Sequence, residues 1–121
     1  MNEEAQREAK KLIAKFEGCQ LKAYKCPAGK WTIGYGHTAG VKAGDVWTQK
    51  QADEALTKEI EEYGKSVLQA CPSLAETPNR LAACISLAYN IGIGNFAGSS
   101  VAKYIRRGEY RAAADAFLMW V

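Results

Sequence analysis

The first third of the chain changes from a helical to a β-like pattern of apolar positions. Between Glu3 and Phe16 the apolar groups recur at the spacing of one helical face, at Ala5, Ala9, Leu12, Ile13 and Phe16. Gly18 follows as a natural helix stop. From Gln20 to Thr38 the short runs LKAY and WTIGY are separated by proline and glycine. This part of the chain therefore predicts one helix and then a small antiparallel sheet.

A second helical pattern begins at Thr48, with Gln51 three residues later in the capping-box position. Its apolar stripe consists of Ala52, Leu56, Ile60, Tyr63 and Val67. The charged residues between Lys50 and Glu62, Glu59 among them, are interpreted as a solvated face. Pro72 ends this helix. Thr77 and Pro78 then have N-cap and first-turn chemistry for LAACISLAY, which is apolar nearly all round and predicts a buried central helix.

The last third predicts a glycine-rich turn, NIGIGNF, and two shorter helices. One is expected from about Ser99 to Arg107, and the other from Tyr110 onward. The chain stops at FLMWV with a full apolar stripe and no cap, which predicts that a C-terminal part of the domain is missing. We expect a single α+β domain over residues 1–121. Its sheet lobe covers about 19–47, and its helical lobe covers about 1–18 and 48–121.

Composition narrows the class of protein. A hydrophobic content of 48% and a charged content of 24% are typical of a globular domain. The net charge of +3 weakly favours a polyanionic partner, but the basic residues are scattered along the sequence without the aromatic-basic array of a nucleic-acid binder. No apolar run approaches the ~20 residues of a membrane span, and no signal peptide is visible. One histidine, His37, and four cysteines at irregular spacing predict no metal site.

Glu17 has the chemistry of a candidate general acid. It falls in the last turn of the first predicted helix, where the partial negative charge of the helix dipole disfavours a carboxylate. Phe16 and Leu21 offer apolar cover nearby. Both effects raise the pKa of a glutamate, as proton donation near neutrality requires. On this residue alone, a surface glutamate tolerated at a helix end remains an alternative.

The segment from Phe16 to Thr38, FEGCQLKAYKCPAGKWTIGYGHT, resembles the active-site segment of the phage lysozymes, the endolysins of glycoside hydrolase family 24. That family carries a glutamate, an aspartate and a threonine within E-G-x-x-L-x-A-Y-x-D-x-x-G-x-x-T-I-G-x-G-H. Glu17 and Thr32 match this pattern, whereas Cys26 stands where the aspartate usually is. The resemblance implies that Glu17 protonates the leaving sugar and that Thr32 helps to hold the attacking water. The alternative for Thr32 is ordinary strand propensity.

Cys26 is therefore the main departure from the family pattern. Hydrolysis with inversion needs a base opposite the acid, with room for water between them. A thiolate can accept a proton or position water once it is ionised, and the lysines at 22, 25 and 30 are near enough in sequence to favour ionisation. The family resemblance includes cysteine as an accepted variant here. A disulfide partner, a packed thiol and a covalent thioglycoside remain alternatives.

The resemblance covers about residues 5 to 120 and includes a second motif, YNIGIGNFAGSS. It implies that this motif lines the far side of the saccharide cleft, through Tyr89, Asn90, Phe96 and Ser99. It also implies that His37 supports the sheet rather than taking part in the chemistry. The alternative for the second motif is that these four residues only belong to helix ends and turns.

The resemblance implies a lysozyme-like fold, with a cleft between a small antiparallel sheet lobe and a helical lobe. The expected activity is that of a muramidase, which hydrolyses the β-1,4 bond between N-acetylmuramic acid and N-acetylglucosamine of peptidoglycan and so lyses the host. We expect a monomer without cofactor, made in the host cytoplasm and acting on the cell wall, with no nucleic-acid partner and no stable membrane insertion. The alternatives are a lytic transglycosylase or chitinase, and a non-catalytic wall-binding module.

Overall fold

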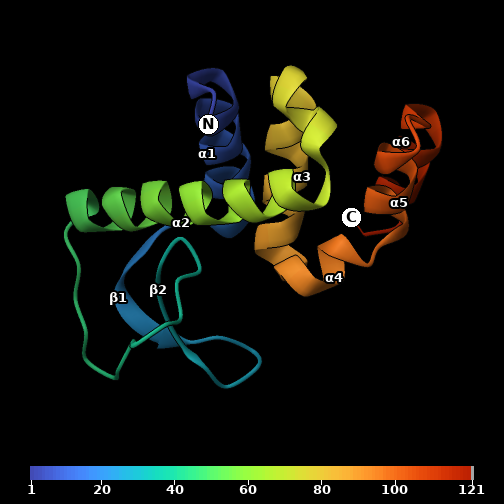
Figure 1. The fold of residues 1–121 in the computed structure, drawn as a ribbon. Coiled ribbons are helices and arrows are strands. Elements are labelled where there is room, and N and C mark those ends of the chain that lie inside the picture. Colours follow the sequence, from blue (N-terminus) through green and yellow to red (C-terminus); the bar gives the residue numbers. More distant parts are fainter. Residues whose placement is uncertain (121) are drawn as a thin grey trace.

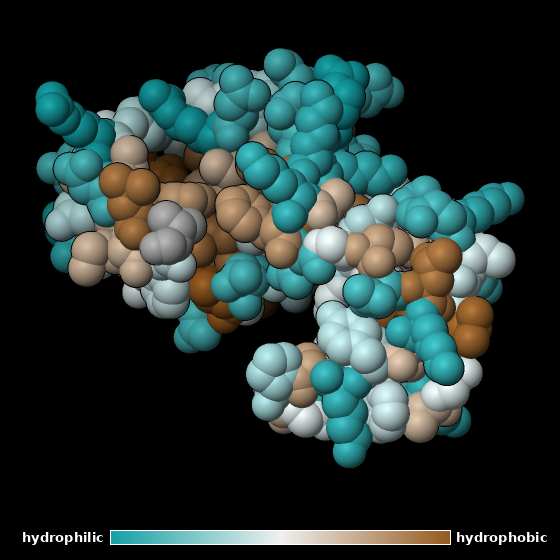
Figure 2. Space-filling view, turned by 180° about the vertical axis from the view of Figure 1, so that it is seen from behind, coloured by the Kyte–Doolittle hydropathy of each residue, from teal (hydrophilic) through white to brown (hydrophobic). Residues whose placement is uncertain are grey.

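The computed structural model describes residues 1–120 and places a small two-stranded lobe beside a group of helices (Figure 1). In chain order the elements are α1 (Glu3–Glu17), β1 (Gln20–Lys25), β2 (Trp31–Gly34), α2 (Gln49–Ala70), the 3-10 helix η1 (Pro72–Glu76), α3 (Pro78–Ile91), α4 (Ile93–Ala97), α5 (Ser100–Arg106) and α6 (Tyr110–Leu118). Figure 2 shows the small lobe standing off from the helical part, with a recess between the two. The predicted α+β architecture, with a small antiparallel sheet lobe and a helical lobe, is confirmed.

Helix α1 begins and ends at residues that satisfy its free backbone groups. The Asn2 side chain accepts hydrogen bonds from the backbone N–H groups of Glu4 and Ala5, at 2.7 and 3.3 Å. At the other end Gly18 adopts a φ of +66°, a conformation that favours glycine. The helix therefore ends as predicted, and Glu17 is its last residue.

Strands β1 and β2 pair antiparallel, with Tyr24 opposite Thr32 and Lys25 opposite Trp31. The tip of this hairpin is closed by the Cys26 N–H, which donates to the Lys30 carbonyl at 2.9 Å. The predicted sheet is confirmed, but the second strand is shorter than WTIGY because the chain turns directly after Gly34. The lobe is thus a short ribbon whose tip lies between Cys26 and Lys30.

The predicted starts of α2 and α3 differ in how they are capped. Thr48 and Gln51 form the full capping box, with bonds of 3.1 and 2.8 Å, and α2 ends before Pro72 as expected. Helix α3 does begin at Pro78, but the Thr77 side chain makes no capping bond. Its hydroxyl is buried and has no hydrogen-bond partner among the described residues. The backbone at Thr77 has a ψ of 82°, well short of the extended value of 163° at Thr48.

The glycine-rich segment after α3 contains more structure than the sequence predicts. We expected only a turn, whereas Ile93–Ala97 forms the short helix α4. Gly92, with a φ of +92°, ends α3 and lets the chain turn straight into the next helix. Helix η1 was not predicted either. The last two helices are confirmed, and Ser99 caps α5 by accepting from the Ala102 N–H at 3.2 Å.

The core lies in the helical lobe around α3, which packs against both α1 and α2. In Figure 1 α1 and α3 run side by side and α2 crosses them. The largest fully buried side chains include Phe96, Ile13, Ile60, Leu81 and Ile85. Cys84 is buried among them, as expected of a residue in the segment LAACISLAY, which predicts a buried central helix. Among residues 1–120, no helix combines the length and apolar character that a bilayer crossing requires.

Candidate active site

Glu17 ends α1 directly against the turn that follows β2. A Cβ atom added to Gly36 would lie 3.0 Å from Oε2 of Glu17, and the φ of Gly36 is +79°. Glycine is therefore required here both by the backbone conformation and by the approach of the carboxylate. The fold holds the tip of Glu17 against backbone that belongs to the sheet lobe, at the junction of the two lobes.

The surroundings of Glu17 favour its protonated form. Glu17 is an exposed residue, but desolvation of its carboxyl by the neighbouring atoms raises its pKa above the usual range. Glu17 also borders a cavity of about 450 Å³, which lies against α1, α3 and α6 and includes Tyr89 and Asn90 in its wall. No residue of the sheet lobe lines this cavity, so it is separate from the recess between the two lobes. The raised pKa is the property that suits Glu17 to donate a proton.

Cys26 and Thr32 come together at the tip of the hairpin. Hydrogen bonding to backbone groups, that of Lys30 first, lowers the pKa of the Cys26 thiol, and the Thr32 hydroxyl contributes in the same direction. Thr32 is only 3% exposed, and its hydroxyl donates to the Lys30 carbonyl at 3.1 Å. Cys26 is therefore an ionisable thiol whose charged form the hairpin stabilises.

The hydroxyl of Thr32 has one proton to donate and two lone pairs that accept. While that proton is held by the Lys30 carbonyl, the lone pairs can accept from a water molecule. When Cys26 is ionised, the same proton can turn toward the sulfur. The pair can therefore hold a water while Cys26 takes up its proton.

Glu17 does not belong to this pair. It lies beside Gly36, near the end of the ribbon where Gln20 pairs with Gly34, whereas Cys26 lies at the opposite end. The fold therefore holds Glu17 and Cys26 at the two opposite ends of the ribbon.

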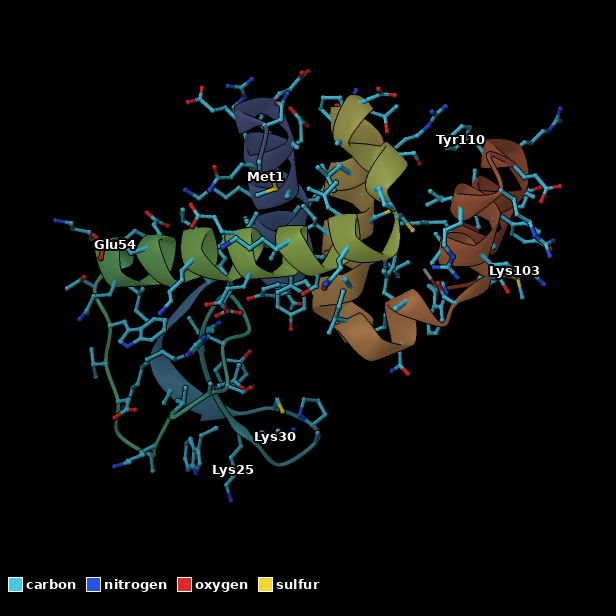
Figure 3. All side chains as sticks on the ribbon, in the orientation of Figure 1. Met1, Lys25, Lys30, Glu54, Lys103 and Tyr110 are labelled. Atoms are coloured by element: carbon cyan, nitrogen blue, oxygen red, sulfur yellow. The ribbon has the colours of Figure 1, made fainter. Side chains whose placement is uncertain are left out.

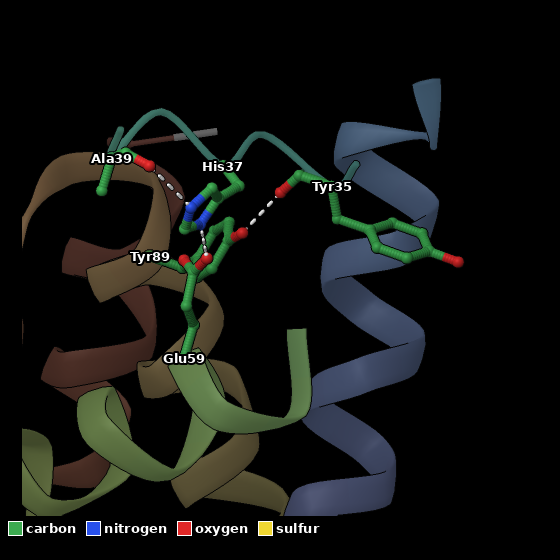
Figure 4. Close-up of polar contacts among 5 residues, drawn as sticks. All are labelled: Tyr35, His37, Ala39, Glu59 and Tyr89. Atoms are coloured by element: carbon green, nitrogen blue, oxygen red, sulfur yellow. Dashed lines mark hydrogen bonds and ion pairs between the residues drawn. The ribbon is translucent and has the colours of Figure 1, made fainter. Parts of the chain in front are cut away.

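The turn that carries Gly36 is anchored to two helices (Figure 4). His37 pairs with Glu59 of α2 through Nδ1, and its Nε2 lies 3.0 Å from the Ala39 carbonyl. The Tyr89 hydroxyl of α3 donates to the Tyr35 carbonyl. The position of His37 accords with the structural role that the sequence predicts, and the anchored turn is the one that meets Glu17.

Glu59 differs from its predicted place on the solvated face of α2. Its carboxylate is instead partly buried against His37. A usable signal exists in the sequence. Glu59 stands three residues after Leu56 and four before Tyr63, so it shares an edge with the apolar stripe.

The four predicted substrate contacts separate into two groups. Asn90 is exposed, and both Asn90 and Tyr89 line the cavity beside Glu17, although the hydroxyl of Tyr89 is already used by Tyr35. Phe96 is fully buried, and Ser99 is 8% exposed and caps α5. The prediction is therefore corrected for Phe96 and Ser99, because the interior of the helical lobe encloses both side chains.

The comparisons with known proteins agree with this geometry. The Phage lysozyme family model matches residues 14–121. The chain belongs to the phage lysozyme family. It is 40% identical to the endolysin of Acyrthosiphon pisum secondary endosymbiont phage 1, over 90% of this chain and 74% of that protein. It is 41% identical to the endolysin of Bacillus phage PZA, again over 90% of this chain but only 43% of that longer protein.

Solved structures give the same result for the fold of this phage lysozyme. The muramidase domain of SpmX from Asticaccaulis excentricus superposes with a TM-score of 0.84 at 32% identity, over 94% of this chain and 77% of that one. Members of the phage lysozyme family are glycoside hydrolases that cleave peptidoglycan. The segment that contains Glu17, Cys26 and Thr32 lies wholly inside the matched region.

Proposed function

We propose that this phage lysozyme is an endolysin muramidase, which hydrolyses the β-1,4 bond between N-acetylmuramic acid and N-acetylglucosamine and thereby lyses the host cell. The observation that carries the proposal is the environment of Glu17, a carboxyl with a raised pKa held at the junction of the two lobes. We further propose that the protein is made in the host cytoplasm and acts on the cell wall after release, as a monomer and without a cofactor.

The proposed reaction uses Glu17 and Cys26 on opposite sides of the sugar. The Glu17 carboxyl gives its proton to the glycosidic oxygen as the bond from that oxygen to the anomeric carbon breaks. A water held by Thr32 forms the new bond to the anomeric carbon from the other face. The Cys26 thiolate takes the proton that this water loses. Glu17 ends ionised and Cys26 protonated, and solvent returns the proton from one to the other.

The proposed mechanism makes the activity depend on pH. The productive form has Glu17 protonated and Cys26 ionised, although a glutamate ordinarily loses its proton at a much lower pH than a thiol. The shifts in the structure reduce this mismatch, because the pKa of Glu17 is raised and that of Cys26 is lowered. The productive form is therefore most populated midway between the two pKa values, and activity falls on both sides.

Replacing Cys26 by aspartate is expected to move the activity optimum to lower pH. The pKa of aspartate ordinarily lies about 4.6 units below that of a thiol, so the midpoint between the pKa values of acid and base falls as well. The measurement is kcat/KM against pH on soluble peptidoglycan fragments for the wild type, Cys26→Asp and Cys26→Ser. Cys26→Ser, which has no ionisable group in this range, should lose activity on the order of 10²-fold. An unchanged optimum in Cys26→Asp together with full activity in Cys26→Ser would show that the thiol takes no part.

The reaction itself is tested by its products on purified peptidoglycan. Hydrolysis adds one water per bond and releases a reducing N-acetylmuramic acid end, whereas a lytic transglycosylase leaves an anhydro-sugar. We expect reducing ends, detected chemically and by mass spectrometry, and none on chitin oligosaccharides. Anhydro products would assign the transglycosylase reaction instead. Binding without any product would assign a wall-binding module.

A further inference from the structure

The positive charge of this protein is concentrated in one lobe. Residues 19–47, the sheet lobe, contain four lysines and one aspartate. The rest of the chain contains twelve basic and twelve acidic residues and is therefore neutral overall. The whole net charge of +3 belongs to the sheet lobe, although the basic residues look scattered when they are read along the sequence.

The four lysines of this lobe are available for a partner. Lys22, Lys25, Lys30 and Lys42 are all exposed. None of them takes part in an ion pair with another of the described residues 1–120. The one aspartate, Asp45, is used within its own loop, where it accepts from the backbone N–H of Lys42 at 2.8 Å. Nothing within the lobe neutralises these cations.

Two of the lysines, Lys25 and Lys30, lie at the tip of the hairpin (Figure 3). Lys25 directly precedes Cys26 in the chain, and the Lys30 carbonyl accepts from the Cys26 N–H. Nζ of Lys25 lies 5.6 Å from the centre of the Trp31 ring, and Tyr24 beside it is 38% exposed. The tip thus combines cations with aromatic faces, which is a surface suited to an acidic sugar polymer. Lys103, on α5, lies well away from this tip in the same view.

We propose that the sheet lobe is a docking surface for the carboxylates of the peptides attached to peptidoglycan. The proposal rests on the proposed function, because a glycan strand in the recess between the lobes brings its peptide stems next to the hairpin. Carboxylates within roughly one Debye length, about 8–10 Å, attract the lysines at physiological ionic strength. The lysines hold the strand close to Cys26 and raise the rate of encounter.

The proposed substrate points to carboxylates as the partner. Lysine ammonium groups attract carboxylates and phosphates alike, and the sheet lobe contains no arginine that could bind two oxygens of either group at once. The peptides attached to the proposed peptidoglycan substrate carry carboxylates. Flexible lysines at separate points on a ribbon fit carboxylates that occur at variable positions along a strand.

The test measures binding without turnover, in a Glu17→Gln background, to peptidoglycan sacculi stripped of phosphate-bearing polymers. The double variant Lys25→Glu/Lys30→Glu is compared with Lys65→Glu/Lys103→Glu. The second variant changes the net charge equally, at exposed lysines of the helical lobe that form no ion pair with other residues of 1–120. The sheet-lobe variant is expected to bind about tenfold more weakly at physiological salt and with a smaller salt dependence, while the helical-lobe variant changes little. Matched thermal midpoints exclude misfolding.

A second arm uses sacculi whose carboxylates have been converted to amides. The difference between the two double variants should disappear on this material. Four outcomes would each overturn the proposal. They are an equal loss of binding in both variants, a difference that persists on amidated sacculi, an effect seen only on phosphate-bearing walls, and no binding at low salt. The readout is independent of catalysis. A wild-type chain that releases no reducing ends but shows this binding pattern would refute the proposed hydrolysis and leave the docking surface standing.

Discussion

Replacing Glu17 by glutamine is expected to lower kcat about 10²- to 10⁴-fold, the range that a positioned general acid contributes. Glutamine has nearly the same shape and still fits against Gly36, but it has no proton that it can release to a leaving sugar. Release of reducing ends from purified peptidoglycan measures the effect. KM should change little, because the substitution removes a step of the chemistry and leaves the recess intact.

The matched control is Glu62→Gln, which makes the same change at an exposed position of α2. It should keep the wild-type rate. Glu17→Gln should unfold at the same temperature as the wild type or slightly above it, because it removes a negative charge from the negative end of the α1 dipole. Loss of activity together with loss of stability would point to a structural role for Glu17. Activity near the wild-type rate would mean that another group donates the proton.

The sequence predicts several helix ends correctly because each depends on residues that are close together in the chain. Gly18 ends α1, and the Thr48–Gln51 pair starts α2, through contacts within one turn of the chain. The same reasoning fails at Thr77. Its residue type suits a cap, but the 3-10 helix before it sets a backbone angle that takes the hydroxyl out of reach. Helix α4 was missed because glycine-rich segments lack the apolar period that marks longer helices.

The candidate site also contains residues that the sequence identifies and residue pairs that it does not. Glu17, Cys26 and Thr32 stand at a spacing that the family resemblance identifies, so they could be named in advance. The anchor around His37 could not, because its partners lie 22 positions away, and Tyr89 is 54 positions from Tyr35. Such pairs are fixed by how α2 and α3 pack. The place of Glu59 at the edge of the apolar stripe indicates partial burial, but no local pattern identifies its partner. The positive charge of the sheet lobe is an intermediate case. Its four lysines can be found in the sequence, but only the fold shows that they lie together in one lobe.

The second motif shows how a resemblance in sequence can assign the wrong kind of role. Phe96 was predicted to contact substrate, yet its side chain is fully buried in the helical lobe and is among the largest enclosed there. Its motif includes exposed residues such as Asn90 beside interior ones. Motif membership places a residue near a site, whereas only the packing decides whether its side chain faces a substrate or the core.

Replacing Phe96 by alanine is therefore expected to lower the free energy of unfolding by about 3–5 kcal/mol, the usual cost of emptying a buried phenylalanine site. This is a large part of the roughly 5–15 kcal/mol that holds a typical domain folded. Helix α4 packs on both α2 and α3, so the cavity would open where three helices meet. Urea unfolding followed by circular dichroism measures the change.

The matched variant Phe96→Leu keeps most of the side-chain volume and should cost only about 1–2 kcal/mol, which leaves a folded protein for kinetics. Its KM on peptidoglycan fragments should equal that of the wild type, because an enclosed ring cannot touch a sugar. Asn90→Ala, at the exposed wall of the cavity beside Glu17, should instead raise KM with little loss of stability. If Phe96→Leu raised KM without moving the urea midpoint, the ring would have to face the substrate after all, and α4 would have to open for the substrate to reach it.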